Sequence, residues 1–334
     1  MFKEKSGLVN AAILSTGIYL PEKIVTNTEL VESVPYNEDW IKSRTGIDNR
    51  RISAINEYTS VIATYAAQSA LDKSGVDVSD VDLIILATIT PDRLLPSTSS
   101  IVRENIGAYN AIAFDLNGAC TGFIFALHIA EQFIRTCAAR YAIVIAADTL
   151  TRFVTPLEPK NYILFGDGAG SALICPTEEK NQGIASILIG METQYPVDWL
   201  TIPLGAEFRN GNSGNNGTTD HLKMSGREIF RWAVNTVPTA IQESLDRYGA
   251  SIDDIKLIIP HQANLRIISA IANKLKIPLE KFMLTINDYG NTSAASIPIS
   301  LDQAITEGRL KRGDLFMLVA FGGGLAWGVS IIKL

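Results

Sequence analysis

The sequence lacks the features of several large protein classes. It has only three cysteines, irregularly spaced, which fits neither a disulfide framework nor the CxxC pairs of zinc sites. No apolar run approaches the ~20 residues of a membrane helix, and Met1–Asn10 mixes charges without an apolar signal core. The net charge of −6 argues against general nucleic-acid binding, which needs a basic surface. We therefore expect a cytoplasmic protein without a metal, a membrane segment or a nucleic-acid partner.

The sequence is rich in apolar material, with 47% hydrophobic residues over 334 positions. Short runs of Ile, Val and Leu without polar alternation are typical of strands buried on both faces, and helical stretches separate them. The predicted strands are Val81–Thr88, Tyr141–Ala147, Ser171–Cys175, Leu257–Ile259, Leu315–Ala320 and Val329–Ile332. The predicted helices are Ser60–Ser74, Thr121–Ala139, Arg227–Tyr248, Leu265–Leu275 and Ala294–Glu307. This alternation predicts a layered α/β fold.

Both halves of the chain contain the same elements in the same order. The matched segments are V-D-L-I-I-L-A-T from Val81 with I-K-L-I-I-P-H-Q from Ile255, N-G-A-C-T-G-F from Asn117 with Y-G-N-T-S-A-A from Tyr289, and the glycine clusters from Phe165 and Phe321. Chance likeness between α/β segments is common, but the matched glycine clusters favour duplication. We predict an N-terminal half, residues 1–180, and a C-terminal half, residues 181–334. The glycine clusters are tight strand connections or places where backbone approaches a ligand, and neither is a nucleotide-binding motif.

Cys120 differs from the other cysteines because it begins a predicted helix. The partial positive charge and unpaired N–H groups at a helix start favour a thiolate, lower a cysteine pKa and can bind an oxyanion. Cys137, deep in the same predicted helix, and Cys175, at a strand end, are better interpreted as small core residues. Taken alone, Cys120 is also more often a buried core residue than a nucleophile.

His261 is the histidine best placed to partner Cys120. It follows a buried strand, and α/β sheets carry their chemistry at the carboxyl ends of strands. His128 lies about 12 Å along the helix from Cys120, and His221 follows an Asn/Gly-rich stretch. Asn291 begins the equivalent helix of the second half. It could cap that helix or donate a hydrogen bond to a carbonyl oxygen, and the residue pattern alone favours the cap.

Four motifs, in the correct order, resemble the β-ketoacyl-acyl carrier protein synthase III family. They are G-A-C-T-G-F around Cys120, P-H-Q-A-N-L-R-I around His261, G-N-T-S-A-A-S around Asn291 and F-G-G-G-L-A-W-G from Phe321. D-W-I-x-x-R-T-G-I from Asp39 and M-x-G from Met224 also match, and the likeness runs from about Ala12 to Leu334. The resemblance implies a homodimer with a thiolase-like five-layer αβαβα fold built from two duplicated halves.

The resemblance also implies a two-stage acyltransferase reaction without a cofactor. Cys120 takes an acyl primer from acyl-coenzyme A (acyl-CoA), which is a substrate. Malonyl-acyl carrier protein then loses CO₂, and the carbanion attacks the acyl-Cys to give a 3-oxoacyl product that initiates fatty acid synthesis. His261 and Asn291 stabilise the enolate, and the N–H groups of Cys120 and Gly323 form the oxyanion hole. Thiolases use a second cysteine near the C-terminus and elongating synthases a second histidine, and this chain has neither.

Further residues match the family's binding surfaces. Those matching contacts to coenzyme A and the pantetheine tunnel are Trp40, Arg44, Met224, Gly226, Phe230 and Asn264. Those matching or neighbouring the basic dock for the acidic carrier protein are Arg231, Arg266 and Lys274, for which the alternative is a solvated charged face.

Two positions depart from the family pattern. Pro159 replaces an arginine that packs on the adenine, and neighbouring Lys160 is not a planar stacking group, so the acyl donor could instead be carrier-bound. Leu95 stands where a bulky residue closes the acyl pocket across the dimer in acetyl-specific members, which leaves room for a longer or branched primer. The Gly/Asn-rich segment Asn210–Asp220 is expected to gate the tunnel.

Two other functions stay open. One is a secondary-metabolism, polyketide-type relative that condenses a different primer or transfers an acyl group to oxygen or nitrogen. The other is a non-catalytic scaffold that binds a carrier protein. The intact set of Cys120, His261 and Asn291 favours decarboxylating condensation and argues against the scaffold.

Overall fold

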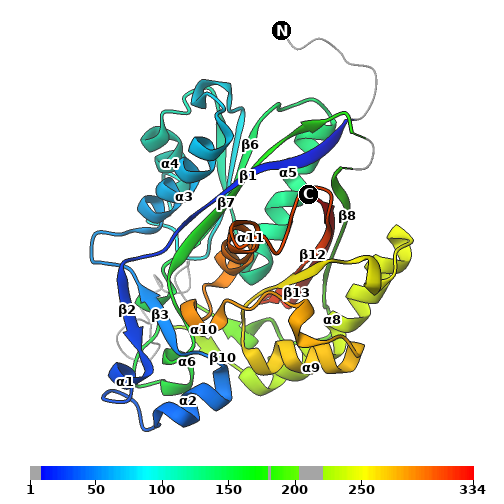
Figure 1. The fold of residues 1–334 in the computed structure, drawn as a ribbon. Coiled ribbons are helices and arrows are strands. Elements are labelled where there is room, and N and C mark those ends of the chain that lie inside the picture. Colours follow the sequence, from blue (N-terminus) through cyan, green and yellow to red (C-terminus); the bar gives the residue numbers. More distant parts are fainter. Residues whose placement is uncertain (1–8, 180–181, 203–220) are drawn as a thin grey trace.

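The computed structural model describes residues 9–179, 182–202 and 221–334, and it is built around two large sheets with helices between and outside them (Figure 1). The first sheet has the strand order β1-β7-β6-β4-β5 and the second β11-β12-β13-β8. The strands of the first sheet are β1 (Asn10–Tyr19), β7 (Gly168–Thr177), β6 (Ala142–Asp148), β4 (Leu83–Ala87) and β5 (Ile112–Leu116). Those of the second are β11 (Leu257–Pro260), β12 (Leu315–Gly322), β13 (Ala326–Lys333) and β8 (Gly183–Met191).

Helices form three layers, one between the two sheets and one on the outer face of each. The outer helices on the first sheet are α3 (Thr59–Ser74) and α4 (Thr98–Ile106), the central ones are α5 (Gly122–Arg135) and α11 (Ser296–Thr306), and those on the second sheet are α8 (Gly226–Tyr248) and α9 (Leu265–Leu275). Alternate side chains of β4 pack against different helix layers. Leu83 and Ile85 contact the central helices, whereas Ile84 and Leu86 contact the outer helices of the first sheet. The unbroken apolar runs arise because both strand faces are covered. The predicted five-layer order is confirmed.

The two sheets repeat one topology. In the first, β1 pairs antiparallel with β7, β7 antiparallel with β6, and β6 parallel with β4. In the second, β8, β13, β12 and β11 follow with the same orientations. A single parallel bridge between Ile258 and Phe282 stands where the first sheet has β5. The proposed division at residues 180 and 181 falls between β7 and β8, and two separate domains stay a prediction.

The predicted strands and helices are present, with differences at their ends. Two predicted helices begin with a 3-10 turn instead, η2 (Ala119–Thr121) and η7 (Ser293–Ala295). The placement of Cys137 was wrong: α5 ends before it, because Ala138 and Ala139 donate back to Phe133 O and turn the chain toward β6. Cys137 and Cys175 are both half-buried rather than core residues, and Cys175 lies within β7.

The structure also bears on the predicted absence of a membrane segment. Within the described ranges, no helix combines the length and the hydropathy that crossing a membrane would require.

Candidate active site

Cys120 lies where the two halves of the chain meet. It sits in η2, directly before α5, and its residue is only 7% exposed. The end of β12 packs against it: a Cβ on Gly322 would lie 2.6 Å from Cys120 Cβ and 3.0 Å from its Sγ. The second half therefore supplies one wall around the thiol, and only a glycine fits at that wall.

Burial dominates the electrostatics of Cys120. It raises the pKa of the thiol to about 12, although hydrogen bonds from the Ser293 side chain and from the main chain of Cys120 and Gly323 act in the lowering direction. The predicted lowering of this pKa was wrong, because desolvation of the anion outweighs the donors around it. The resting group is a thiol, and its proton must leave when the sulfur attacks.

His261 follows β11, as predicted, and is almost fully buried. Its main-chain N–H donates to Val319 O, its Nδ1 lies 2.8 Å from Ser296 Oγ, and its ring meets Phe321 edge-on with centroids 5.5 Å apart. Burial lowers the pKa of the imidazole to about 3, partly opposed by a contact with the Ser293 main chain. His261 is therefore neutral at neutral pH and can donate one hydrogen bond without carrying a charge.

Asn291 lies between α10 (Ile286–Tyr289) and η7. Its side chain can cap η7 and still donate a hydrogen bond to a carbonyl oxygen. Its Oδ1 accepts from Ser293 N at 2.9 Å, a cap-type bond that leaves the Nδ2 hydrogens for other acceptors. Its main chain is held by Leu164 O and Gly166 N at 2.9 and 3.1 Å. A Cβ on Gly166 would lie 2.2 Å from Tyr289 O, so the first glycine cluster allows two loops to touch. Sequence reasoning did not identify this support.

Two cavities meet at Cys120. The larger, about 1180 Å³, contains Cys120, His261 and Asn291 on its wall. The predicted substrate residues that line it are Trp40, Arg44, Met224, Gly226, Phe230 and Asn264. The smaller, about 320 Å³, lies beyond the thiol among Ile89, Phe125, Leu222 and the second glycine cluster. Leu95 lines neither cavity and is 85% exposed. The arrangement is a channel that leads to a thiol, with a mostly apolar pocket behind it.

Helix α2 (Glu38–Thr45) presents Trp40 and Arg44 to the larger cavity. Tyr36 stacks on the Trp40 ring with centroids 3.9 Å apart and an interplanar angle of 11°, and the Arg44 guanidinium lies 5.8 Å from the ring. Pro159 and Lys160 belong to the same cavity wall. Tyr36 was not predicted, because an aromatic four positions before another signals no particular function in sequence.

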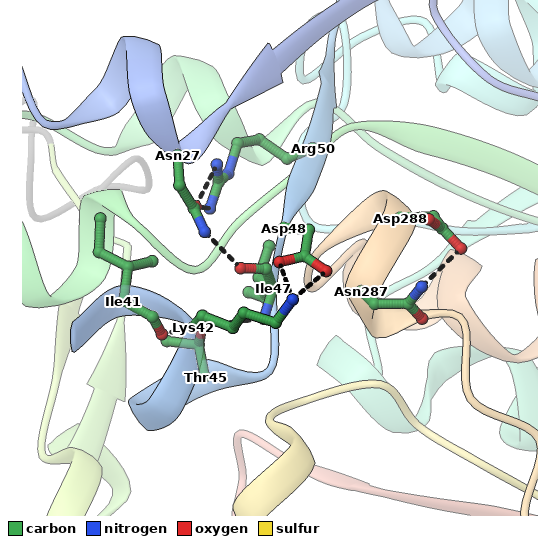
Figure 2. Close-up of polar contacts among 9 residues, drawn as sticks. All are labelled: Asn27, Ile41, Lys42, Thr45, Ile47, Asp48, Arg50, Asn287 and Asp288. Carbon is green, nitrogen blue, oxygen red and sulfur yellow. Dashed lines mark hydrogen bonds and ion pairs between the residues drawn. The ribbon is translucent and has the colours of Figure 1, made fainter. Parts of the chain in front are cut away.

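A polar network, buried at Asn27 and Arg50 and exposed at Lys42 and Asp48, anchors the end of α2 (Figure 2). Asn27 Nδ2 donates to Ile47 O at 2.7 Å, and the Arg50 guanidinium donates to Asn27 Oδ1 at 3.0 Å. Lys42 pairs with Asp48 at 3.0 Å, and the Asp48 main chain binds Asn287 O at 2.9 Å. Since Asn287 belongs to α10, the network ties the helix that carries Trp40 to the loop that carries Asn291.

Positively charged side chains outnumber negatively charged ones on the wall of the larger cavity. Its charged lining residues are Arg44, Lys160, Arg227, Arg231 and Arg266, against Glu158 and Glu228. Lys274, the third predicted docking residue, is exposed but away from this wall, and its Nζ binds Val234 O and Asn235 Oδ1 on α8. The predicted gate Asn210–Asp220 lies outside the described residues. In the described part of the chain, no three His, Cys, Asp or Glu side chains form a group that could hold a metal.

Comparison with known proteins identifies the family. Residues 114–192 match the family model of 3-oxoacyl-[acyl-carrier-protein] synthase III, and residues 245–334 match the model of its C-terminal part. A Clostridium perfringens β-ketoacyl-[acyl-carrier-protein] synthase III is 44% identical over 97% of this chain and 99% of its own. The crystal structure of the Aquifex aeolicus synthase III superposes with a TM-score of 0.89 at 40% identity, covering 97% and 100% of the chains. The priming β-ketosynthase of the R1128 polyketide pathway superposes with a TM-score of 0.92 at 31% identity, covering 100% and 99%. This chain belongs to the β-ketoacyl-acyl carrier protein synthase III family, with its thiolase fold.

Proposed function

We propose that the protein catalyses the decarboxylating condensation of an acyl primer with malonyl-acyl carrier protein, giving the 3-oxoacyl-carrier protein that initiates fatty acid synthesis. The observation that carries the proposal is the position of Cys120. The thiol lies between a cationic channel and a mostly apolar pocket, and shares the channel with His261 and Asn291.

In the first stage, Cys120 Sγ attacks the thioester carbonyl of the primer donor. The C–S bond to the donor thiol breaks, and the acyl chain rests in the 320 Å³ pocket behind the sulfur. The main-chain N–H groups of Cys120 and Gly323 are the donors for the oxyanion, in keeping with their position against Cys120 Sγ.

In the second stage, His261 and Asn291 donate hydrogen bonds to the malonyl thioester oxygen while CO₂ departs. Negative charge grows on that oxygen as the enolate forms, so preorganised donors lower the barrier without acting as bases. A buried neutral imidazole suits this role, because its lowered pKa keeps it from binding a proton of its own. The enolate carbon then attacks the acyl-Cys120 carbonyl, the C–S bond breaks, and the Cys120 thiolate that leaves takes up one proton to restore the thiol.

Two macromolecular partners are part of the proposal. The cationic wall with Arg231 and Arg266 suits an acidic carrier protein and would steer it to the channel of a chain with a net charge of −6. A second copy of the chain suits the outer edge of β5, the last strand of its sheet, where no other strand pairs among the residues that the structure describes. Two large apolar side chains are exposed: Ile112 on β5 at 64%, and Leu95, which precedes α4, at 85%. Exposed apolar side chains of this kind are typical of a surface that a partner covers.

A polyketide-type priming role is the second candidate function. It is favoured by the likeness to the R1128 priming ketosynthase and by the altered adenine site, where Pro159 lines the channel and Tyr36 stacks on Trp40. The two candidates differ in primer and donor rather than in the chemistry at Cys120.

Intact-protein mass spectrometry after incubation with acyl-CoA thioesters of increasing chain length tests the proposal. We expect a gain of one acyl group that is absent in Cys120→Ala and retained in Cys175→Ala, the matched control on β7. Acylation by a carrier-bound donor alone would favour the second candidate. A gain that survives in Cys120→Ala, or no gain with either donor class, would reject both.

A further inference from the structure

A buried carboxyl group without an assigned role lies close enough to the thiol for its charge to raise the pKa of Cys120. Asp148 ends β6 and is fully buried. Its Oδ1 accepts three hydrogen bonds, from Ile89 N at 2.8 Å, Thr88 Oγ1 at 3.0 Å and Thr90 Oγ1 at 3.2 Å. Its Oδ2 is equally buried and has no hydrogen-bond partner in the part of the chain that the structure describes. A buried carboxylate oxygen without a donor is costly, so its retention calls for an explanation.

Ser293 connects this carboxyl group to Cys120. Its Oγ donates to Cys120 Sγ at 3.9 Å, and the residue is fully buried in η7, which packs on the end of β6. The same hydroxyl is close enough to Asp148 to lower the pKa of that carboxyl, while falling short of hydrogen-bond geometry to Oδ2. Ser293 has a φ of 54°, a conformation that is unfavourable for residues other than glycine. The fold thus holds a hydroxyl between a thiol and a carboxylate.

The surroundings suit a proton acceptor. Burial raises the pKa of Asp148 to about 6, against hydrogen bonds from Ile89, Ser293, Thr88 and Thr90. The protein groups that donate to Asp148 are uncharged, and His261, which follows β11 in the other sheet, is neutral at this pH. A carboxylate with a pKa near neutrality is a better general base than one of ordinary acidity. His261, whose pKa burial lowers to about 3, is a much weaker acceptor.

We infer that Ser293 and Asp148 relay the thiol proton during acylation of Cys120, an inference that rests on the proposed function. In the resting site the Ser293 hydroxyl donates to Cys120 Sγ, and in the relay it turns from Sγ toward the unpartnered Asp148 Oδ2. As Sγ attacks the primer thioester, its S–H bond breaks and the proton passes to Ser293 Oγ. The Ser293 hydroxyl proton passes to Asp148 Oδ2. When the C–S bond to the donor breaks, the same path returns one proton to the departing thiolate. The products are acyl-Cys120 and the free donor thiol, with Ser293 and Asp148 restored. Ser293 contacts the reacting sulfur, and Asp148 is a positioning and proton-holding residue that acts through it.

The alternative is that Asp148 only holds the segment after β4 in place through its three hydrogen bonds. The two accounts predict opposite effects of Asp148→Asn. Asparagine keeps an oxygen for those three donors but is not a base. The negative charge of Asp148 raises the pKa of Cys120. If Asp148 is only structural, Asp148→Asn removes that charge and makes the thiol more reactive. If Asp148 accepts the thiol proton, Asp148→Asn removes the base and makes the thiol less reactive.

Alkylation of Cys120 by iodoacetamide separates these accounts without any acyl substrate. Wild-type enzyme, Asp148→Asn, Ser293→Ala and the control Asp167→Asn are alkylated from pH 5 to 9 and followed by intact mass. Asp167 is another fully buried carboxyl, which accepts from Ser53 N, Thr151 N and Thr151 Oγ1. It lines neither cavity at Cys120.

We expect Asp148→Asn and Ser293→Ala to react ~100-fold more slowly than wild type, as loss of a general base implies. Both should lose the rise in rate near pH 6, whereas Asp167→Asn should keep it. Acylation by the primer should fall in parallel. Equal or faster alkylation in Asp148→Asn, or in Ser293→Ala should Asp148→Asn not fold, would overturn the relay. Failure of wild-type enzyme to accept any primer would instead count against the proposed function.

Discussion

Substitution of Gly322 by alanine tests how closely the end of β12 is fitted to Cys120. The new Cβ would lie 2.6 Å from Cys120 Cβ, whereas carbon atoms pack at about 3.5–4.0 Å. Gly322 is not at a positive φ, so alanine meets a steric conflict rather than backbone strain. Relief requires a shift of about 1 Å at the thiol, and a displacement of that size costs ~100-fold in rate. This corresponds to about 2.7 kcal/mol of transition-state stabilisation.

Gly328→Ala provides the matched control. Its Cβ would lie 2.9 Å from Ile124 Cγ2, a similar crowding on β13 that does not involve Cys120. Both variants should lose about 1–3 kcal/mol of stability from overpacking, measured by urea unfolding. Only Gly322→Ala should also lose acylation of Cys120, measured as a single-turnover rate by quench-flow and intact mass. Acylation within threefold of wild type in a folded Gly322→Ala variant would show that the end of β12 does not constrain the position of the Cys120 thiol.

Three further predictions follow from the site and its supports. His261→Ala and Asn291→Ala should each lower malonyl decarboxylation ~100-fold or more while Cys120 is still acylated, measured as CO₂ release; equal loss of both steps would contradict their assignment to the second stage. Arg50→Met should cost about 3 kcal/mol in urea unfolding, because it leaves Asn27 Oδ1 and Ile163 O without their donor, and an unchanged midpoint would contradict this. Because burial lowers the pKa of His261 to about 3, the unfolded chain binds a proton below about pH 6.5 that the folded chain does not. Wild type should therefore lose stability relative to His261→Ala as pH falls from about 6.5, by up to ~1.4 kcal/mol per pH unit, and a pH-independent difference would argue against a buried neutral imidazole.

Much of the architecture could be predicted because it depends on local pattern. The strands covered on both faces, such as β4 and β6, appear as unbroken apolar runs. The edge and outer strands β1, β5 and β8 were missed, because their half-buried residues mix with polar and small ones and no periodic pattern emerges.

The site was predictable in its residues but not in its electrostatics. Cys120, His261 and Asn291 stand in motifs, and the fold brings them to one cavity. The direction of the Cys120 pKa shift was wrong, because a helix start is visible in sequence and the depth of burial is not. Asp148 and Ser293 were missed for a related reason, since each gains its importance from a tertiary contact across the two halves.

The most direct test of the account is a single-turnover condensation with isolated acyl-Cys120 enzyme and malonyl-acyl carrier protein, followed by the mass of the carrier. We expect a carrier that gains the acyl group and loses one CO₂, together with an enzyme that returns to its unmodified mass. A carrier that loses CO₂ without gaining the acyl group, or an acyl-enzyme that persists unchanged, would contradict the central claim that this site joins the two acyl units.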